Sequence, residues 1–318
     1  MAILVTGANG FVGRAVCEAG KRAGHQMIAC RRGGEETDSV RIIADITEES
    51  GLAEAMAGCE TVIHLVARTH VLQETESDPL SAYRLVNVAG TKAVAEAARR
   101  ADVRRIVFMS SIKVNGEQTG EAPYTEKSPP APEDAYGETK LEAESVLRKA
   151  CERAQIDWVI LRPPLVYGPG VGGNFRALMG LCDSGLPLPF GGAAENRRSM
   201  IAVENLASAA LCAATHPAAP GKVFLVRDGS DLSTAALIRA LRSAMGRRAR
   251  LLPIPAGLMR MALAAAGKSA IARRLFGSLQ INDSLIRETL GWRPVLDTKT
   301  ALARTAEAWR AAKIQQAE

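Results

Sequence analysis

Thr6-Gly7-Ala8-Asn9-Gly10-Phe11-Val12-Gly13 is the stretch that decides the fold. It follows a short apolar run, Ile3-Leu4-Val5, and opens a helical stretch that ends near Gly24. Gly7 permits a tight turn, Gly10 lets the backbone approach a pyrophosphate, and Gly13 lets helix and strand pack closely. The free N–H groups at the helix N-terminus then bind the phosphates. This context predicts a dinucleotide-binding loop with cofactor contacts from Gly7, Asn9, Gly10, Phe11, Val12 and Gly13.

Outward from this loop, short apolar runs alternate with helical stretches. Because the runs are apolar throughout, they indicate parallel strands that helices cover on both faces. The expected fold class is therefore α/β, a doubly wound parallel sheet. The expected strands are 3–5, 26–30, 40–44, 61–66, 105–109, 158–161 and 222–226, and the expected helices are 12–23, 47–57, 80–100, 135–153 and 203–215.

The character of the chain changes after Arg162, where Gly and Pro become frequent up to Gly192. We expect a dinucleotide-binding domain over residues 1–165, to which the helix and strand near 203–226 return. Residues 166–318 would then form mainly a smaller, interleaved C-terminal lobe that binds the substrate.

Composition excludes several classes of protein. The 318 residues carry a formal charge of +6 and are 4% aromatic, and the positive residues are dispersed. They therefore offer no stacking platform for nucleic acid. The N-terminal apolar run is too short for a secretion signal or a membrane span. The 6 cysteines are scattered without metal-ligand spacing, so we expect reduced thiols, no metal site and a cytoplasmic protein.

Three side chains point to the coupled transfer of a hydride and a proton. Tyr136 and Lys140 stand four residues apart on an expected helix and so share one face. Ser111 follows an expected strand, and ligands of doubly wound sheets bind beyond the carboxyl ends of the strands. A tyrosine can exchange the proton if a lysine ammonium lowers its pKa from about 10. We therefore predict Ser111, Tyr136 and Lys140 as the catalytic residues.

The glycine spacing, Ser110-Ser111 and Tyr136-Gly137-Glu138-Thr139-Lys140 together resemble the extended short-chain dehydrogenase/reductases, the NAD-dependent epimerase/dehydratase family. The segment Leu290-Gly291-Trp292-Arg293-Pro294 extends the resemblance over nearly the whole chain. The resemblance implies a Rossmann fold. It also implies further cofactor contacts from Asp45, Ile46, Leu65, Val66, Ala67, Asn87, Tyr136, Lys140 and Pro163. We expect His64 to be a buried histidine with satisfied hydrogen bonds.

The second expected strand ends in Cys30-Arg31-Arg32-Gly33. Enzymes that use NAD usually carry Asp or Glu here to bind the ribose hydroxyls, whereas Arg accommodates the 2′-phosphate of NADP. Arg31 and Arg32 therefore favour NADP(H), and NAD(H) is the alternative.

Two segments, 110–117 and 163–170, resemble bacterial enzymes of surface-polysaccharide (O-antigen) synthesis that act at C4 of UDP-linked N-acetylated hexoses. Lys113 and Asn115 depart from the residues usual in that family, and the segment 197–201 lacks the usual Asp and His. The resemblance implies that Asn174 and Arg198 bind phosphate groups and that Leu188 and Phe190 contact the uracil. The expected substrate contacts are Ser111, Lys113, Asn174, Leu188, Phe190 and Arg198.

The arginine pair favours a UDP-4-keto-sugar reductase that consumes NADPH, and the alternative is a UDP-sugar 4-epimerase with tightly bound NAD. A non-catalytic dinucleotide sensor is a third possibility, but such proteins tend to lose the Tyr–Lys pair. The resemblance also implies a homodimer through the two long helices 80–100 and 135–153. The stretch Leu251–Ala266 could contact a membrane, but Pro253 and Pro255 favour a helix of the lobe, and no integral membrane segment is expected.

Overall fold

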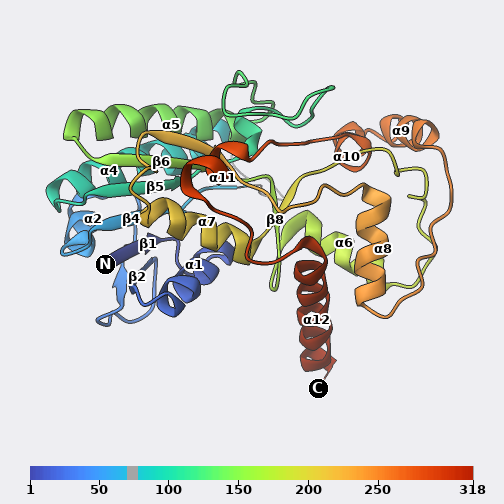
Figure 1. The fold of residues 1–318 in the computed structure, drawn as a ribbon, viewed down its shortest axis with the longest axis horizontal. Coiled ribbons are helices and arrows are strands. Elements are labelled where there is room, and N and C mark those ends of the chain that lie inside the picture. Colours follow the sequence, from blue (N-terminus) through green and yellow to red (C-terminus); the bar gives the residue numbers. More distant parts are fainter. Residues whose placement is uncertain (70–77, 318) are drawn as a thin grey trace.

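A computed structural model describes residues 1–69 and 78–317 of the chain. Its centre is a seven-stranded sheet in which all neighbouring strands run parallel, in the order β3-β2-β1-β4-β5-β6-β9 (Figure 1). The predicted α/β class and parallel sheet are confirmed. The strands are β1 Ala2–Thr6, β2 Gln26–Arg31, β3 Val40–Ile42, β4 Thr61–His64, β5 Arg105–Met109, β6 Asp157–Arg162 and β9 Lys222–Leu225.

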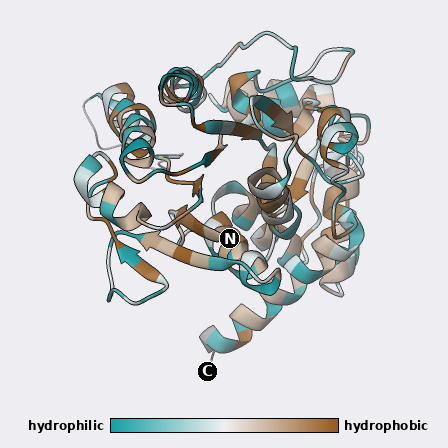
Figure 2. Cartoon of the chain, turned by 60° about the vertical axis from the view of Figure 1, so that its left-hand side comes forward, coloured by the Kyte–Doolittle hydropathy of each residue, from teal (hydrophilic) through white to brown (hydrophobic). Residues whose placement is uncertain are grey.

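Helices cover both faces of the sheet because its central strands are apolar and buried on both sides. One cluster of buried side chains joins one face to α1 (Phe11–Arg22), α7 (Val203–Thr215) and α11 (Ser284–Leu290). A second cluster joins the other face to α2 (Glu49–Met56), α4 (Gly90–Arg100) and α5 (Ala135–Ala154). Figure 2 shows apolar strands between these layers and hydrophilic outer helix faces.

The helix expected over 80–100 is one continuous rod with a local irregularity. It consists of α3 (Pro79–Arg84), a π-helical turn η1 (Leu85–Ala89) and α4. Asp78 caps its N-terminus by accepting a hydrogen bond from the Ser81 N–H. π-helical turns inside α-helices are frequent at functional sites, and this one contains Asn87.

The rest of the chain forms a lobe beside the sheet, at the right of Figure 1. Its own core contains buried side chains such as Tyr167, Phe175 and Met200. The short parallel pair β7 and β8 links the lobe to the sheet domain. Its elements are β7 Leu165–Tyr167, α6 Gly173–Asp183, β8 Met200–Ala202, α8 Thr234–Ala244, α9 Ala256–Ala265, α10 Ser269–Phe276 and α12 Thr298–Ala317.

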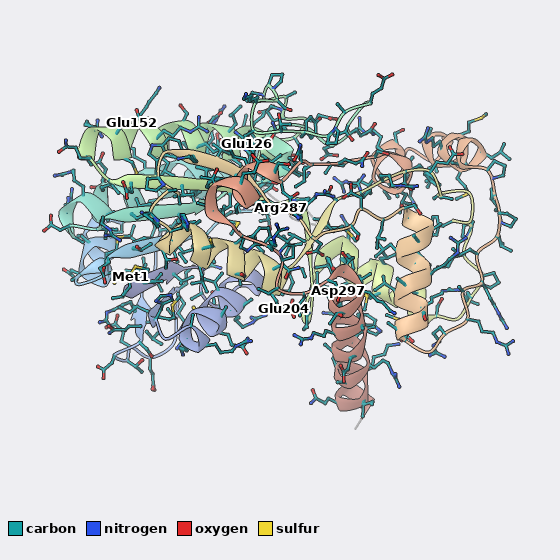
Figure 3. The ribbon with its side chains drawn as sticks, in the orientation of Figure 1. Met1, Glu126, Glu152, Glu204, Arg287 and Asp297 are labelled. Carbon is teal, nitrogen blue, oxygen red and sulfur yellow. The ribbon has the colours of Figure 1, made fainter. Side chains whose placement is uncertain are left out.

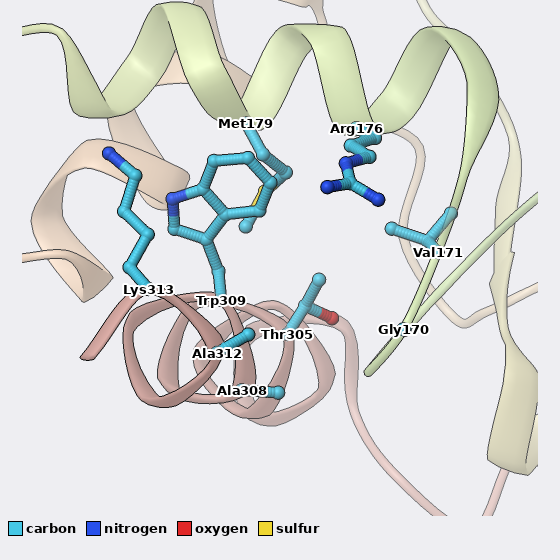
Figure 4. A pocket seen from close by; sticks show the side chains of 10 residues that line it. Gly170, Val171, Arg176, Met179, Thr305, Ala308, Trp309, Ala312 and Lys313 are labelled. Atoms are coloured by element: carbon cyan, nitrogen blue, oxygen red, sulfur yellow. The ribbon is translucent and has the colours of Figure 1, made fainter. Parts of the chain in front are cut away.

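The C-terminal helix α12 is fastened to α6 by a buried carboxylate. Asp183 accepts a hydrogen bond from the Trp309 indole at 3.2 Å, pairs with Arg247 at 3.0 Å, and contacts the Lys313 ammonium. Beside this cluster, a cavity of about 190 Å³ lies between α6 and α12. Trp309 and Thr305 point into it toward Met179 (Figure 4). The cavity is a gap in the packing of the two helices, and it lies apart from the Ser–Tyr–Lys group.

Candidate active site

The glycine turn after β1 has the shape that a pyrophosphate needs. Gly7 has a φ of +70°, which favours glycine. A Cβ atom on Gly13 would lie 2.2 Å from the Gly7 carbonyl oxygen, so only glycine lets α1 start this close to the turn. Gly10 is the N-cap of α1, and no side chain caps the first turn. Its N–H groups are therefore available to an anion, and the loop fits a dinucleotide.

The residues predicted for the adenosine end of the cofactor follow β2 and β3. Arg31 is half-buried, Arg32 is exposed, and the Arg31 guanidinium lies against Gly34. The Arg31 Nε atom is buried and has no hydrogen-bond partner among the described residues. Asp45 is exposed, and its Oδ1 atom accepts two hydrogen bonds from Thr47. Ile46 contacts the N-terminus of α4 at Gly90, where a Cβ atom would lie 2.9 Å from it.

Leu65 and Val66, which were expected to end β4, run beyond the sheet together with Ala67. Val66 packs against Gly7, so the segment borders the glycine turn. Asn87 ties the following residues to α5: its Oδ1 accepts from the Arg68 N–H at 2.8 Å, and its Nδ2 donates to the Thr139 hydroxyl at 3.0 Å. Asn87 therefore orders the site from the π-helical turn.

His64 is buried, and both ring nitrogens have partners. Its Nδ1 lies 2.7 Å from the Thr6 hydroxyl and its Nε2 lies 3.2 Å from the Thr91 hydroxyl. The Thr91 hydroxyl donates to the Asn87 carbonyl, so it accepts the Nε2–H proton. Burial and then the Lys140 charge lower the pKa of His64 to about 3. His64 is therefore a neutral structural histidine at physiological pH.

Ser111, Tyr136 and Lys140 converge at the carboxyl end of β5. Ser111 caps the short 3₁₀ turn η2 (Ile112–Val114), whose Ile112 N–H donates to the Pro163 carbonyl at 3.0 Å. Tyr136 and Lys140 lie in the first turns of α5, and Tyr136 hydrogen-bonds with Ser111. The buried Lys140 ammonium lies 3.8 Å from the centre of the Phe108 ring.

The proton chemistry of this group depends on burial and on a few charges. Burial and the Asp134 carboxylate raise the pKa of Tyr136 to about 12, although its hydrogen bond with Ser111 opposes the shift. Burial lowers the pKa of Lys140 to about 7, against the charge of Glu144. Tyr136 is thus a proton donor at neutral pH. The pKa of Lys140 therefore lies near neutral pH, whereas that of Tyr136 lies well above it.

The third residue on the same helix face, Glu144, was not predicted. It is 1% exposed and accepts hydrogen bonds from Ser110 at 2.5 Å and from both ends of the Arg162 guanidinium at 2.8 and 2.6 Å. Arg162 also donates a hydrogen bond to the Asn115 side chain at 3.0 Å. Asn115, which departs from the residue usual in the family, is therefore part of this buried network. The regular spacing Tyr136, Lys140, Glu144 was the signal that could have revealed it.

A cavity of about 370 Å³ opens next to the Ser–Tyr–Lys group. Ser111, Lys113, Tyr136, Asn174 and Arg198 all line it, so five predicted residues meet there. Lys113 Nζ is held by Glu117 at 2.6 Å and by Asp134. The rest of its lining is largely apolar and includes residues that the sequence analysis missed: Thr69, Pro164, Leu165, Val166, Leu178, Met200, Leu232, Leu237, Arg274, Leu275 and Leu279.

Leu188 and Phe190 do not line this cavity. They belong to the buried core of the lobe, with 5% and 9% of their surface exposed. The Leu188 backbone instead pairs with Leu251, in the segment before α9. Their expected contact with a uracil base stays a prediction. Because the side chains are buried, the contact would have to come from backbone atoms or follow a movement of the lobe.

Comparison with known proteins identifies the family. The profile of the NAD dependent epimerase/dehydratase family matches residues 3–226. The chain belongs to this family. It is 38% identical, over 96% of its own length and 95% of the relative, to a UDP-glucose 4-epimerase of Vibrio cholerae. A 28% identical relative from Escherichia coli O157:H7, aligned over 81% of this chain and 77% of its own, is an N-acetyl-alpha-D-glucosaminyl-diphospho-ditrans,octacis-undecaprenol 4-epimerase.

A solved structure agrees in fold with this epimerase/dehydratase. UDP-glucuronic acid 4-epimerase from Bacillus cereus, crystallised with NAD, superposes with a TM-score of 0.77 over 98% of this chain and 99% of its own. The two sequences are 19% identical, so the likeness concerns the fold. The predicted Rossmann architecture and the resemblance to the extended short-chain dehydrogenase/reductases are confirmed.

Proposed function

We propose that the protein is a 4-epimerase of a UDP-linked hexose. The observation that carries the proposal is that Ser111 and Tyr136 line the cavity beyond the strand ends, with the buried Lys140 one turn after Tyr136 on α5. The similarity over nearly the whole chain to a UDP-glucose 4-epimerase supports this reaction over others of the family. The sequence resemblance to enzymes of surface-polysaccharide synthesis supports a role in making sugars for such a polymer.

In this proposal the side chains of the chain handle the proton while the cofactor handles the hydride. A nicotinamide dinucleotide held by the glycine turn supplies a hydride acceptor that can return the hydride. Tyr136 takes the proton of the C4 hydroxyl as the hydride leaves C4. After the keto sugar has turned in the cavity, Tyr136 gives the proton back to the C4 oxygen while the hydride returns to the opposite face of C4. Ser111 hydrogen-bonds that oxygen, and Lys140, which is neutral above about pH 7, can accept the proton in turn from Tyr136. Asn174 and Arg198, on the cavity wall, would bind the phosphates.

A second candidate, a 4-keto reductase that consumes NADPH, is favoured by one observation. Arg31 ends β2 and Arg32 follows it, where an adenosine 2′-phosphate would lie, and the Arg31 Nε atom has no hydrogen-bond partner within the described parts of the chain. An epimerase recycles its cofactor and retains it, whereas a reductase must release the oxidised cofactor. The arginines that favour binding of NADP(H) therefore also favour a net reduction of the keto sugar.

The test is to incubate the purified protein with UDP-glucose and with UDP-N-acetylglucosamine, without added cofactor, and to follow the products by NMR. Interconversion with the matching galacto sugar, together with NAD extracted from the protein, is the expected result. Tyr136→Phe should lower the rate by about 10²–10⁴-fold while the protein keeps its cofactor. Product formation only with stoichiometric NADPH and a 4-keto sugar would establish the reductase instead. Normal turnover of the Tyr136→Phe variant would overturn the catalytic assignment.

A further inference from the structure

The charges of the lobe are distributed very unevenly along the chain. Residues 232–282 contain no Asp or Glu, and they carry nine of the 40 basic residues. The remainder of the chain therefore has 31 basic and 34 acidic residues. These nine are Arg239, Arg242, Arg247, Arg248, Arg250, Arg260, Lys268, Arg273 and Arg274, and all but Arg242 and Arg274 are exposed. Arg247, Arg273 and Arg274 pair with carboxylates outside the segment. The other five exposed residues have no ion pair within the described parts of the chain, and such a block of one sign attracts a surface of the opposite sign.

Apolar side chains stand exposed within the same segment. Leu258 and Met261, three residues apart on one face of α9, have 59% and 71% of their surface exposed. Ile271 on α10 is 44% exposed and Leu252, just before α9, is 46% exposed. No residue of α9 is buried. The other face of α9 packs on the lobe through Met259 and Leu263, so this helix carries apolar residues on the solvent side as well.

The two prolines of this stretch lie outside the helix, and α9 is a short helix of the lobe, as expected. Pro253 and Pro255 precede α9, and Pro255 is its N-cap, so they do not interrupt the helix. The helices α9 and α10 lie together at the end of the molecule farthest from β1 and β2 (Figure 1). No helix in residues 1–69 or 78–317 is long and apolar enough to span a bilayer. Any contact would be with the surface of the membrane.

A cavity with two arginines in its lining opens between the same two helices. Its volume is about 320 Å³, and its lining includes Arg260, Arg273 and Ser269 but no acidic residue. The Arg260 guanidinium donates to the Phe276 carbonyl at 2.8 Å, which holds it at the cavity. Arginine and serine donors are suited to phosphate oxygens. The basic cavity beside an exposed apolar helix face matches a layer of anionic headgroups above acyl chains.

We propose that the α9–α10 face, formed by Leu252, Leu258, Met261 and Ile271 with the surrounding basic residues, docks on the surface of a membrane that contains anionic phospholipid. A second copy of the chain would bring two blocks of like charge together, which disfavours self-association through this face. A ten-residue helix is too short to bind alone, so the basic residues supply the second attraction. Arg274 and Leu275 of α10 also line the substrate cavity, which would lie near the membrane.

The test uses the full-length protein and sedimentation with phospholipid vesicles. We expect binding to vesicles with about 30% phosphatidylglycerol, no binding to pure phosphatidylcholine, and release at high salt. The double variant Leu258→Glu, Met261→Glu should bind at least about tenfold more weakly. Neutralising Arg250 and Lys268 to Gln should weaken binding about twenty-five-fold, from roughly fivefold for each basic residue.

Ile314→Glu is the matched control, because Ile314 on α12 is 61% exposed but lies outside the basic segment. It should bind vesicles as the unchanged protein does, and circular dichroism should show that all variants are folded. Absence of binding to the anionic vesicles at low salt would overturn the proposal, as would equal binding by the Leu258→Glu, Met261→Glu variant. A dimer that this variant dissociates, without vesicle binding, would assign the face to a second copy instead. Sugar epimerisation is measured separately, so failure of either proposal leaves the other testable.

Discussion

At the scale of single residues, the site depends on two ionisable groups whose pKa values burial moves in opposite directions. Burial raises the pKa of Tyr136 to about 12 and lowers that of Lys140 to about 7. Sequence spacing could place these two side chains on one helix face. It could not predict how far either is removed from water, because that depends on β5, the loop after it and the lobe.

We predict that the rate of C4 oxidation rises with pH through about 7 and then levels off. The lowered pKa of Lys140 means that the pair holds its extra proton below this pH and has lost it above. His64 cannot cause the change, because its pKa is lowered to about 3. The measurement is kcat/KM between about pH 5.5 and 9.5.

Lys140→Met is the informative variant for this pH profile. It should lower turnover by about 10²–10⁴-fold and remove the midpoint near neutrality, because the tyrosine would then titrate alone. A wild-type profile that is flat or falls between pH 6 and 8 would contradict the assignment of the pair.

At the scale of elements, α5 is joined to β6 by the buried Glu144–Arg162 pair. Arg162 and Glu144 are 4% and 1% exposed. The two residues are 18 positions apart and lie on different elements. Sequence spacing predicts contacts only between neighbours on one element, so it could not predict this pair. The same limit applies to Arg274, which reaches the substrate cavity from α10.

We predict that Glu144→Gln lowers the free energy of unfolding by about 3–5 kcal/mol, because it leaves the Arg162 charge buried without a counter-charge. Urea denaturation of the two proteins measures the difference. Glu152→Gln, at an exposed site on the far end of the same helix (Figure 3), should change it by less than about 0.5 kcal/mol. A loss below 1 kcal/mol for Glu144→Gln would show that water or Asn115 compensates the arginine.

At the scale of the whole molecule, the lobe and the sheet domain are interleaved. The helix α7 and strand β9 return to the sheet from the lobe, and β9 extends it beside β6. Glu126, in the loop before α5, accepts a hydrogen bond from the Leu225 N–H of β9 at 3.0 Å, and Figure 3 shows its position. We propose that the boundary near residue 165 separates a cofactor-binding part from a substrate-binding part, and that the two parts fold as one unit.

We also propose that the chain forms a homodimer through the rod α3–η1–α4 and α5. Leu85, on the π-helical turn, is 60% exposed, and a partner helix would cover it. Leu85→Glu should therefore convert a dimer to a monomer, as measured by sedimentation equilibrium. Ile314→Glu serves again as the control with equal exposure. A wild-type monomer at micromolar concentration would contradict this prediction.

The sequence by itself determined the parallel sheet, the glycine turn and the Tyr–Lys helix face. These features depend on periodicity and on glycine positions within about 20 residues, and local sterics decide them. Only the tertiary structure decided that Leu188 and Phe190 belong to the core of the lobe, that Glu144 pairs with Arg162, and that α9 keeps an apolar face in solvent. Each of these features depends on which element, distant in the sequence, packs over the side chain. The local sequence pattern of apolar or charged residues is the same whether such an element buries them or leaves them exposed.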